Sequence, residues 1–567
     1  MTELLLLGCS DRKTKAPEPT PALWRYDGPI YQDFRAHLRN HRWPQSLDVA
    51  VLSAEFGLIG VLTEIQDYDR RMTRDRANEL APALTKQIET WSAHYSSINL
   101  CLGKDYLAAL PTEQLPHKAR FKVFEGPIGI KRQKLGNYLR DFDSGEHRAP
   151  TKTPVGRLSY FLPDWDDLVD PDFDFATDTY SALKQFRDER HCARIMRPFK
   201  VADGILVSLA QKRDSKGPLK YVGGLDARTM RPFDLRAHYG LDPTQALFGD
   251  CGAFSYVNEK APPFSADYVV SQYDLYNFDF GASIDHIPLP EIVVDGRRVA
   301  LSERERRNRV ALTTSNAEEF IRTAKRRQAR FIPVGVVQGL SAKEMASNAR
   351  LYAEMGYKRI ALGGLVPLPD DIVREVVTTT MTSLRELRNP PEVHLFGIFR
   401  PKLQALFKEQ NVCSFDSATY FRKAWLRSEQ NYLAPGGNWY AAIRVPMTAD
   451  GRTRNQLLSN GGDIEKLKGL ESAALTALHE YGQYKTTLKA TLEAVITYDK
   501  KLARSSEDIS LMKDRYQKTL ADRPWEHCGC PVCQSTGIDV LIFRGSNRNK
   551  RRGIHNTWHL YNIIRGK

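Results

Sequence analysis

The feature that most constrains the fold is a regular alternation of short apolar runs and helical stretches, which begins at Gly204 and continues for about 240 residues. Apolar runs of this length are typical of strands buried on both faces of a parallel sheet. Eight strands with helices between them predict a (β/α)₈ barrel, and a doubly wound sheet is the alternative. The candidate strands cover residues 204–210, 246–249, 268–270, 281–284, 331–337, 359–362, 393–396 and 412–415.

The first 140 residues show the same alternation on a smaller scale. Apolar runs at 4–7, 49–52 and 98–102 are typical of buried strands, and residues 73–95 have a helical pattern. This predicts a separate N-terminal α/β domain over residues 1–140, with a largely parallel sheet.

The charge balance favours a polyanionic partner. The chain has 82 Lys and Arg against 68 Asp and Glu, a formal net charge of +14, and nucleic acid is the first candidate for such an excess. No apolar run is long enough to cross a membrane, and Met1-Thr2-Glu3 does not begin a signal peptide. We therefore expect a cytoplasmic protein with no membrane partner, in which the 8 cysteines form no disulfide framework.

Three cysteines near the C-terminus form a metal-binding pattern. Cys528, Cys530 and Cys533 have the spacing C-x-C-x₂-C, so a single turn can present all three thiolates to one tetrahedral zinc ion. A fourth ligand is needed, and His527 is too close to the turn, which leaves His555 or His559. The sequence predicts a structural Zn²⁺ site, because four protein ligands leave no position open for water.

These patterns divide the chain into four segments. After the N-terminal domain, residues 141–199 form a linker and barrel-entry segment with a helix near 180–197, and residues 200–460 form the barrel. Residues 461–567 contain a strongly helical segment, to about residue 521, followed by the zinc-binding module.

Polar residues follow several of the predicted barrel strands. Catalytic residues of such barrels lie at the C-terminal ends of the strands, and these positions hold three carboxylates and an amide. A single Asp at such a place is usually a helix cap or a turn residue, so the inference depends on the whole series occurring in order. The series is Asp250-Cys251-Gly252-Ala253-Phe254, Asp285, Gln338-Gly339, Gly363-Gly364-Leu365 and Asp416.

In this order, followed by the cysteine cluster and a His-Asn pair, the motifs resemble the tRNA-guanine transglycosylase superfamily over residues 200–567. The chain is most similar to the branch of DNA-guanine transglycosylases that act in 7-deazaguanine modification of DNA. The segment from Tyr160 to Asp167 also resembles that branch. The resemblance favours His555, which precedes Asn556, as the zinc ligand.

The resemblance also implies a role for each strand-end carboxylate. Asp416 matches the nucleophile, whose carboxylate attacks the anomeric carbon and holds the sugar covalently while the bases exchange. Asp250 matches the aspartate that transfers protons as bases leave and enter. Asp285 matches the acceptor for the N1–H and N2–H₂ edge shared by guanine and 7-deazaguanines.

The remaining site residues are expected to hold the base. Gln338 and the Gly364 N–H would donate to O6, and Leu365 would contact the 7-substituent. Phe254 and Phe396 would stack on the two faces of the ring.

Departures from the tRNA-enzyme pattern favour DNA as the substrate. Val366-Pro367 follows Gly-Gly-Leu, Ser255 replaces a Gln, and residues 417–422 lack the usual Pro-rich run. We therefore expect exchange of guanine in DNA for a 7-deazaguanine such as 7-cyano-7-deazaguanine (preQ0), with a partner protein of the modification system as one possibility. The alternatives are the same reaction on tRNA, or a catalytically idle nucleic-acid-binding scaffold.

Two further predictions concern segments outside the predicted pocket. Basic runs at 297–309, 325–327 and 544–552 are candidates for phosphate contacts, and the last lies beside the cysteine cluster. In the N-terminal domain, the turns at 8–13 and 53–59 resemble those of the peroxide-stress YaaA group. They could bind a phosphate or a base, or could be helix caps.

Overall fold

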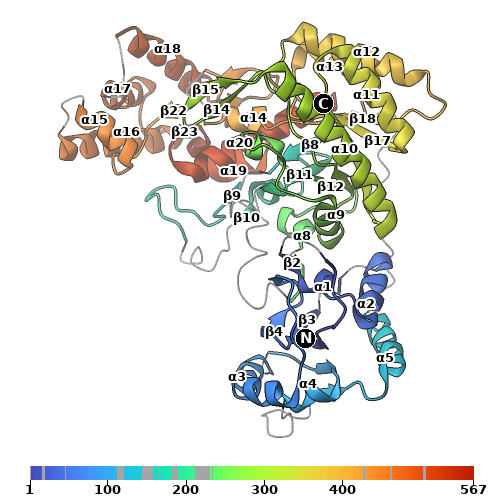
Figure 1. The fold of residues 1–567 in the computed structure, drawn as a ribbon. Helices are drawn as coiled ribbons and strands as arrows, with labels where there is room; N and C mark the ends of the chain where they lie inside the picture. Colours follow the sequence, from blue (N-terminus) through green and yellow to red (C-terminus); the bar gives the residue numbers. More distant parts are fainter. Residues whose placement is uncertain are drawn as a thin grey trace.

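The computed structural model describes residues 2–566, apart from 16–18, 42, 45, 93, 111–119, 143–157, 165–166, 182–189, 211–229, 233, 426–428, 460–462 and 502–505. Within this part of the chain, no helix combines the length and the apolar character needed to cross a bilayer. Figure 1 shows the N-terminal residues below the barrel, with the C-terminal helices extending to one side of it.

Eight parallel strands close into a barrel, which confirms the predicted fold class. In order around the barrel they are β8 (Ser159–Pro163), β11 (Gly204–Ser208), β12 (Ala246–Asp250), β13 (Phe280–Ala282), β16 (Ile332–Val337), β17 (Arg359–Leu362), β18 (Glu392–Leu395) and β19 (Ser414–Asp416). The surrounding helices are α8 (Leu235–Tyr239), α9 (Ala266–Leu275), α10 (Glu303–Arg327), α11 (Ala342–Met355), α12 (Asp370–Arg385), α13 (Gln404–Glu409) and α14 (Thr419–Lys423).

The structure corrects the identity of one barrel strand. Residues 268–270 lie in α9, which Ser265 caps by accepting a hydrogen bond from the Tyr268 N–H, so the prediction of a strand there was wrong. Its apolar residues are buried as one face of a helix, because tertiary packing overrides the β-propensity of a short run. The missing strand is β8, which closes the barrel between β19 and β11 and comes from the segment predicted as barrel entry.

The helix predicted near 180–197 is absent from the described part of that segment. Residues 182–189 lie outside the described residues, and the chain after them forms β10 (Arg190–His191) and a short 3₁₀ helix, η4 (Cys192–Met196). The domain limits at 140, 199 and 460 stay predictions.

Side chains inside the barrel form layers, as strand alternation requires. Leu206, Phe248 and Val336 belong to the buried interior cluster. In each of these strands, the residue two positions later points to the same side and lies nearer the C-terminal mouth of the barrel. Ser208, Asp250 and Gln338 therefore face that mouth together.

The N-terminal residues form a five-stranded sheet of order β4 (Gly57–Gly60), β3 (Leu47–Ser53), β1 (Glu3–Gly8), β6 (Ile98–Cys101) and β7 (Phe121–Val123), antiparallel only at β4. The three predicted strands are confirmed. Helix α3 (Arg74–Ser92) packs on one face, while α2 (Pro29–Asn40) and α5 (Ile128–Arg140) pack on the other. Backbone contacts join this domain to the barrel region, for example from Val49 N to Met230 O, 2.8 Å.

The described residues between 461 and 521 are largely helical, as predicted, and further helices lie on both sides of this segment. The helices are α15 (Gly451–Ser459), α16 (Ile464–Gly482), α17 (Leu488–Asp499), α18 (Ser506–Asp522), α19 (Pro531–Thr536) and α20 (Gly545–Ile564). Helix α20 packs against α14, which begins three residues after Asp416. The cysteine-bearing module is therefore attached to the barrel next to the end of β19.

The basic run at 544–552 is buried rather than exposed to a ligand. Arg548 is paired with Asp539 at 2.8 Å and with Asp178, and Arg552 donates to the Ala424 carbonyl at 2.6 Å. Arg544 and Arg551 are buried as well. The prediction that this run contacts phosphates was wrong, because its guanidinium groups hold the module together.

Candidate active site

Three carboxylates converge at the C-terminal mouth of the barrel. Asp250 is the last residue of β12, Asp416 is the last residue of β19, and Asp285 follows β13 by three residues. Burial, with the negative charges of Asp285 and Asp416, raises the pKa of Asp250 to about 8. The structure thus brings the three predicted carboxylates close enough for Asp285 and Asp416 to act on the protonation of Asp250.

Asp416 is held in place by two donors, one from the neighbouring strand β18 and one from the turn that follows it. The Gly397 N–H donates to Asp416 Oδ1 at 2.7 Å, and His394 Nε2 lies 3.2 Å from the same oxygen. Gly397 has φ +69°, a left-handed conformation that suits glycine and directs its N–H at the carboxylate.

His394 is a site residue that the sequence analysis missed. Its ring is fully buried, and burial lowers its pKa, so the imidazole is neutral. A carboxylate can only accept, so Nε2–H donates to Asp416, while Nδ1, 2.9 Å from Ser414 Oγ, accepts from that hydroxyl. The only sequence signal was its place two residues before Phe396, with the same inward direction.

Asp285 and Gln338 form a fixed pair. Gln338 Nε2 donates to Asp285 Oδ2 at 2.8 Å, and burial raises the pKa of Asp285 to about 6 even though this hydrogen bond lowers it. Gln338 was expected to donate to a base, which stays a prediction; in this structure its amide donates to the Asp285 carboxylate.

Two glycines leave room for the Gln338 side chain. A Cβ on Gly363 would lie 2.3 Å from Gln338 Nε2, and one on Gly364 would lie 2.9 Å from Oε1. Gly364 has φ +70° in addition. The Gly-Gly pair is therefore required by the packing of the Asp285–Gln338 pair.

The predicted apolar contacts differ in their exposure. Phe254 is 55% exposed in the short 3₁₀ helix η6 (Ala253–Tyr256), so its ring is accessible. Phe396 is half-buried against Phe248 and His394, and Leu365 is buried. Phe254 and Phe396 make no ring contact with each other among the described residues.

Ser208 is a second residue that the sequence analysis missed. It lies opposite Asp250 in the β11–β12 ladder, and its buried hydroxyl has no hydrogen-bond partner within the described part of the chain. A Cβ on Gly252 would lie 2.0 Å from this hydroxyl. A buried polar group of this kind is available to a ligand at the mouth.

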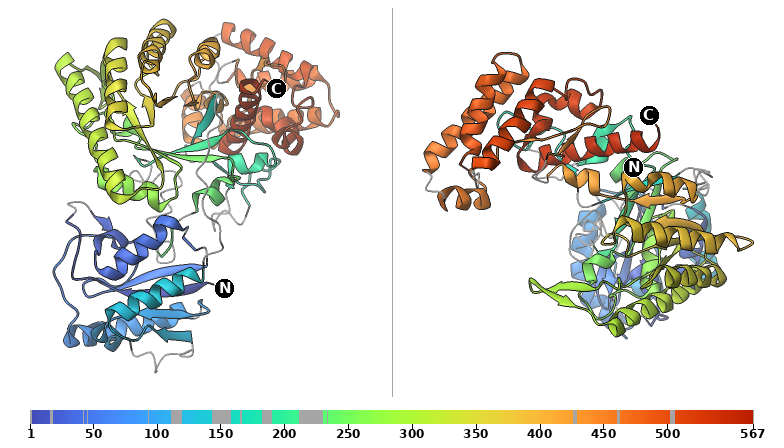
Figure 2. Two further views of the ribbon diagram at one scale, coloured as in Figure 1. Left: turned by 90° about the vertical axis from the view of Figure 1, so that its right-hand side faces the viewer. Right: turned by 90° about the horizontal axis from the view of Figure 1, so that it is seen from above.

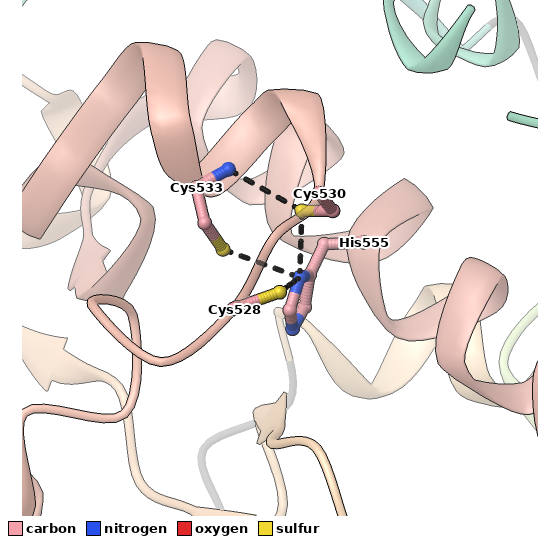
Figure 3. A group of neighbouring side chains, drawn as sticks. All are labelled: Cys528, Cys530, Cys533 and His555. Carbon is pink, nitrogen blue, oxygen red and sulfur yellow. Dashed lines mark hydrogen bonds between the residues drawn. The ribbon is translucent and has the colours of Figure 1, made fainter. Parts of the chain in front are cut away.

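Cys528, Cys530, Cys533 and His555 form a buried group that could hold a metal ion, and Figure 3 shows the three sulfurs directed at the imidazole. His555 Nδ1 lies 3.3 Å from the sulfurs of both Cys530 and Cys533. His555 Nε2 lies 2.8 Å from the Leu433 carbonyl and donates to it, which leaves Nδ1 unprotonated and able to bind a metal.

The two histidines considered for this group differ in position. His559 Nε2 is 3.4 Å from Cys528 Sγ but lies outside the four-residue group. The contacts of Asn556 show why an asparagine follows His555. Its side chain accepts a hydrogen bond from the Leu433 N–H at 2.8 Å and donates one to the Asn431 carbonyl at 2.7 Å. It therefore fixes the same segment that orients His555.

Comparisons with known proteins show the family to which the chain belongs. No protein-family model matches the chain. A DNA-guanine transglycosylase from Salmonella montevideo is 35% identical over 417 residues, which cover 72% of this chain and 97% of that protein. A tRNA-guanine(15) transglycosylase from Pyrococcus abyssi (strain GE5 / Orsay) is 38% identical over 90 residues, which cover 16% of this chain and 15% of that protein. The chain therefore belongs to the DNA-guanine transglycosylase family of the tRNA-guanine transglycosylase superfamily, whose members are pentosyltransferase enzymes.

Proposed function

We propose that this enzyme exchanges guanine in DNA for a 7-deazaguanine, with preQ0 as the incoming base, through a covalent aspartyl–sugar intermediate. The observation that carries the proposal is the arrangement of two carboxyl groups in different environments. Asp416 is held by two donors, while burial and nearby charges raise the pKa of Asp250 to about 8. A carboxylate oxygen that is fixed by donors is suited to attack a carbon atom, and a carboxyl group with a pKa near 8 is suited to transfer protons.

In the first step, an oxygen of Asp416 bonds to C1′ of the deoxyribose as the C1′–N9 bond of guanine breaks. Asp250 is largely protonated at pH 7 and gives its proton to the departing base. In the second step, the Asp250 carboxylate takes the N9–H proton of the incoming 7-deazaguanine. That nitrogen then bonds to C1′ and displaces Asp416, so no oxidant, reductant or ATP is consumed.

Base selection is assigned to Asp285. Its pKa of about 6 keeps it largely ionised at pH 7, so it can accept hydrogen bonds from N1–H and N2–H₂. Adenine has no such pair of donors on that edge, so the buried carboxylate would lose the hydrogen bonds from the base and keep only internal partners such as Gln338, which is costly. The exposed ring of Phe254 can stack on the base, with Phe396 and Leu365 as further contacts.

Zinc is the metal that suits the cysteine-rich group. Three thiolates and a neutral imidazole are a tetrahedral donor set, and the second hydrogen bond of His555 fits that assignment. When bound, zinc would hold Cys528, Cys530, Cys533 and His555 together as a structural centre. The chain's own residues carry out the exchange.

DNA is favoured over tRNA by the extent of the two likenesses. The protein named for DNA matches most of this chain, and the one named for tRNA matches a short part. A cytoplasmic location, expected from the sequence, is consistent with either substrate.

The direct experiment is incorporation of labelled guanine and preQ0 by purified protein into plasmid, single-stranded DNA and tRNA. We expect label in DNA and none with Asp416→Asn, whose metal content should equal that of the wild type. Label in tRNA alone would refute the DNA assignment. Undiminished exchange by Asp416→Asn would refute its role as nucleophile. If exchange on duplex appears only in the presence of cell extract, a partner protein is required.

A further inference from the structure

A β-hairpin extends from the loop that follows Asp285. It consists of β14 (Glu291–Val294) and β15 (Arg297–Ala300), which pair with each other and with no other described strand. Asp295 and Gly296 connect them with φ values of +49° and +76°, the two positive values of a type I′ turn. The turn gives the hairpin a defined geometry.

The surface of this hairpin is unusual for a segment without a partner. Val293 and Val299 are 54% and 43% exposed, and every residue of β15 is exposed. An isolated two-stranded hairpin is marginally stable in water, and exposed aliphatic side chains gain nothing there. Exposed aliphatic side chains on an otherwise isolated hairpin are typical of a surface that contacts another molecule.

The strand register places charge beside apolar surface on both faces of the hairpin. Val293 lies opposite Arg298, and Val294 lies opposite Arg297, so each face presents a valine next to an arginine. Both arginines are exposed, and Arg298 also pairs with the exposed Glu291 at 2.9 Å, a surface contact that contributes little and can be exchanged for a phosphate. Guanidinium groups bind phosphates, and aliphatic side chains contact sugars and base edges or separate neighbouring bases. The hairpin therefore has the chemistry of a ribbon that contacts DNA.

The base of the hairpin is connected to the catalytic mouth. Leu301 N–H donates to the Pro290 carbonyl at 2.9 Å, and Asn258 Nδ2 donates to the Val293 carbonyl at 2.7 Å. Asn258 lies four residues after Phe254, and Tyr256 OH donates to the Asp285 carbonyl at 3.1 Å. In the view from above, the hairpin projects from the barrel on the side from which the C-terminal helices also extend (Figure 2).

We propose that the β14–β15 hairpin is the element that contacts duplex DNA beside the target nucleotide and stabilises the opened state in which the guanine has left the stack. This inference rests on the proposed function, since a base in a duplex must leave the stack to reach Asp416. The arginines bind the phosphates flanking the target. The valines contact the part of the base stack that the target guanine has left. A two-stranded ribbon is narrow enough to enter a major groove.

The test compares single-stranded and duplex substrates of the same sequence. One variant combines Val293→Thr, Val294→Thr and Val299→Thr, which keeps β-branched shape and removes apolar surface. Another combines Arg297→Gln and Arg298→Gln. Matched controls are Leu351→Gln on α11 and Arg322→Gln on α10, both exposed positions on outer helices.

For wild-type protein we expect labelled-guanine exchange on both substrates. The valine variant should keep its single-strand rate within about twofold and lose at least tenfold on the duplex. A mismatch opposite the target guanine should restore much of that loss, because an unpaired base needs less help to leave the stack. The arginine variant should raise the KM for the duplex more than tenfold, and the controls should match the wild type.

Other outcomes separate the two proposals. Equal losses on single strand and duplex, or no loss on either, would overturn the role of the hairpin while leaving the exchange reaction intact. A wild-type protein that modifies only tRNA would overturn both proposals. A loss that a mismatch does not reduce would overturn the stabilisation of the opened base, and melting curves of each variant check its folding.

Discussion

His394 Nε2 lies 3.2 Å from Asp416 Oδ1, although the two residues come from different strands, β18 and β19. With Ser414 on the other ring nitrogen, the imidazole has one orientation and one tautomer. One oxygen of Asp416 is therefore fixed by hydrogen bonds, and in the proposed reaction the carboxylate would approach the sugar in one orientation. His394 is a positioning residue for the proposed nucleophile.

Removing this contact should slow the reaction without weakening base binding. We expect His394→Ala to lower kcat by about 10-fold to 100-fold, since small misplacement of a reacting group has effects of this order, with KM for the free base nearly unchanged. His394→Gln, whose amide can donate to Asp416, should recover part of the rate. Steady-state exchange kinetics of both variants provide the measurement. A rise in KM with unchanged kcat would contradict the positioning role.

The activity should depend on pH with two limbs. In the proposed reaction Asp285 must be ionised to accept hydrogen bonds from the base, so kcat/KM should fall below about pH 6. Asp250 must be protonated to release guanine, so kcat/KM should also fall above about pH 8. Exchange rates from pH 5 to 9.5 test the prediction, and Asp285→Asn should lose the acidic limb. A profile that is flat across this range would contradict both assignments.

The raised pKa of Asp250 also predicts an effect on stability. The unfolded-state pKa is about 3.9, so between about pH 4 and pH 8 the folded protein binds more protons, and its stability decreases as the pH rises. Asp250→Asn should remove this cost and, if Asp250 transfers protons as proposed, should also abolish exchange. The expected gain near pH 8 is about 1–3 kcal/mol, less than full burial would give, because the residue keeps part of its surface open.

Calorimetry of Asp250→Asn and wild-type protein at several pH values provides the measurement. The difference in melting temperature should disappear near pH 4. A variant less stable than wild type at pH 8 would show that the carboxyl group is not destabilising.

The two histidines near the cysteines offer a matched pair of variants. His555→Ala should lose bound zinc, because it removes a member of the buried four-residue group, while His559→Ala should retain one equivalent. Structural zinc contributes about 10–16 kcal/mol in small peptides, so His555→Ala should also loosen α20. Metal analysis and exchange activity of both variants are the measurements. Equal zinc in both would exclude His555 as a ligand.

Much of the barrel is predictable from the sequence. Its strands are short apolar runs, and between them lie segments whose apolar residues recur with the spacing of a helix. The error at 268–270 arose because three consecutive apolar residues fit either a strand or the buried side of a helix. Strand β8 was overlooked because Asp164 and its acidic neighbours follow it directly. Only the closure of the ladder between β19 and β11 identifies it.

Side-chain roles that depend on neighbours were harder to predict. Asp250, Asp285 and Asp416 could be found because each follows its strand, but His394 acts through a contact with another strand that the sequence does not reveal. The arginines of α20 have the same composition as a phosphate-binding run. One of their partners, Asp178, comes from a distant part of the chain, and Asp539 comes from the turn that precedes the helix.

These internal arginines bear on how tightly the protein should bind a polyanion. Each guanidinium that neutralises a phosphate releases counterions, and the affinity falls with added salt in proportion to the number of such contacts. Arg544, Arg548, Arg551 and Arg552 are already occupied inside the protein and release none. The dependence of DNA affinity on salt should therefore be shallower than the formal charge of +14 suggests.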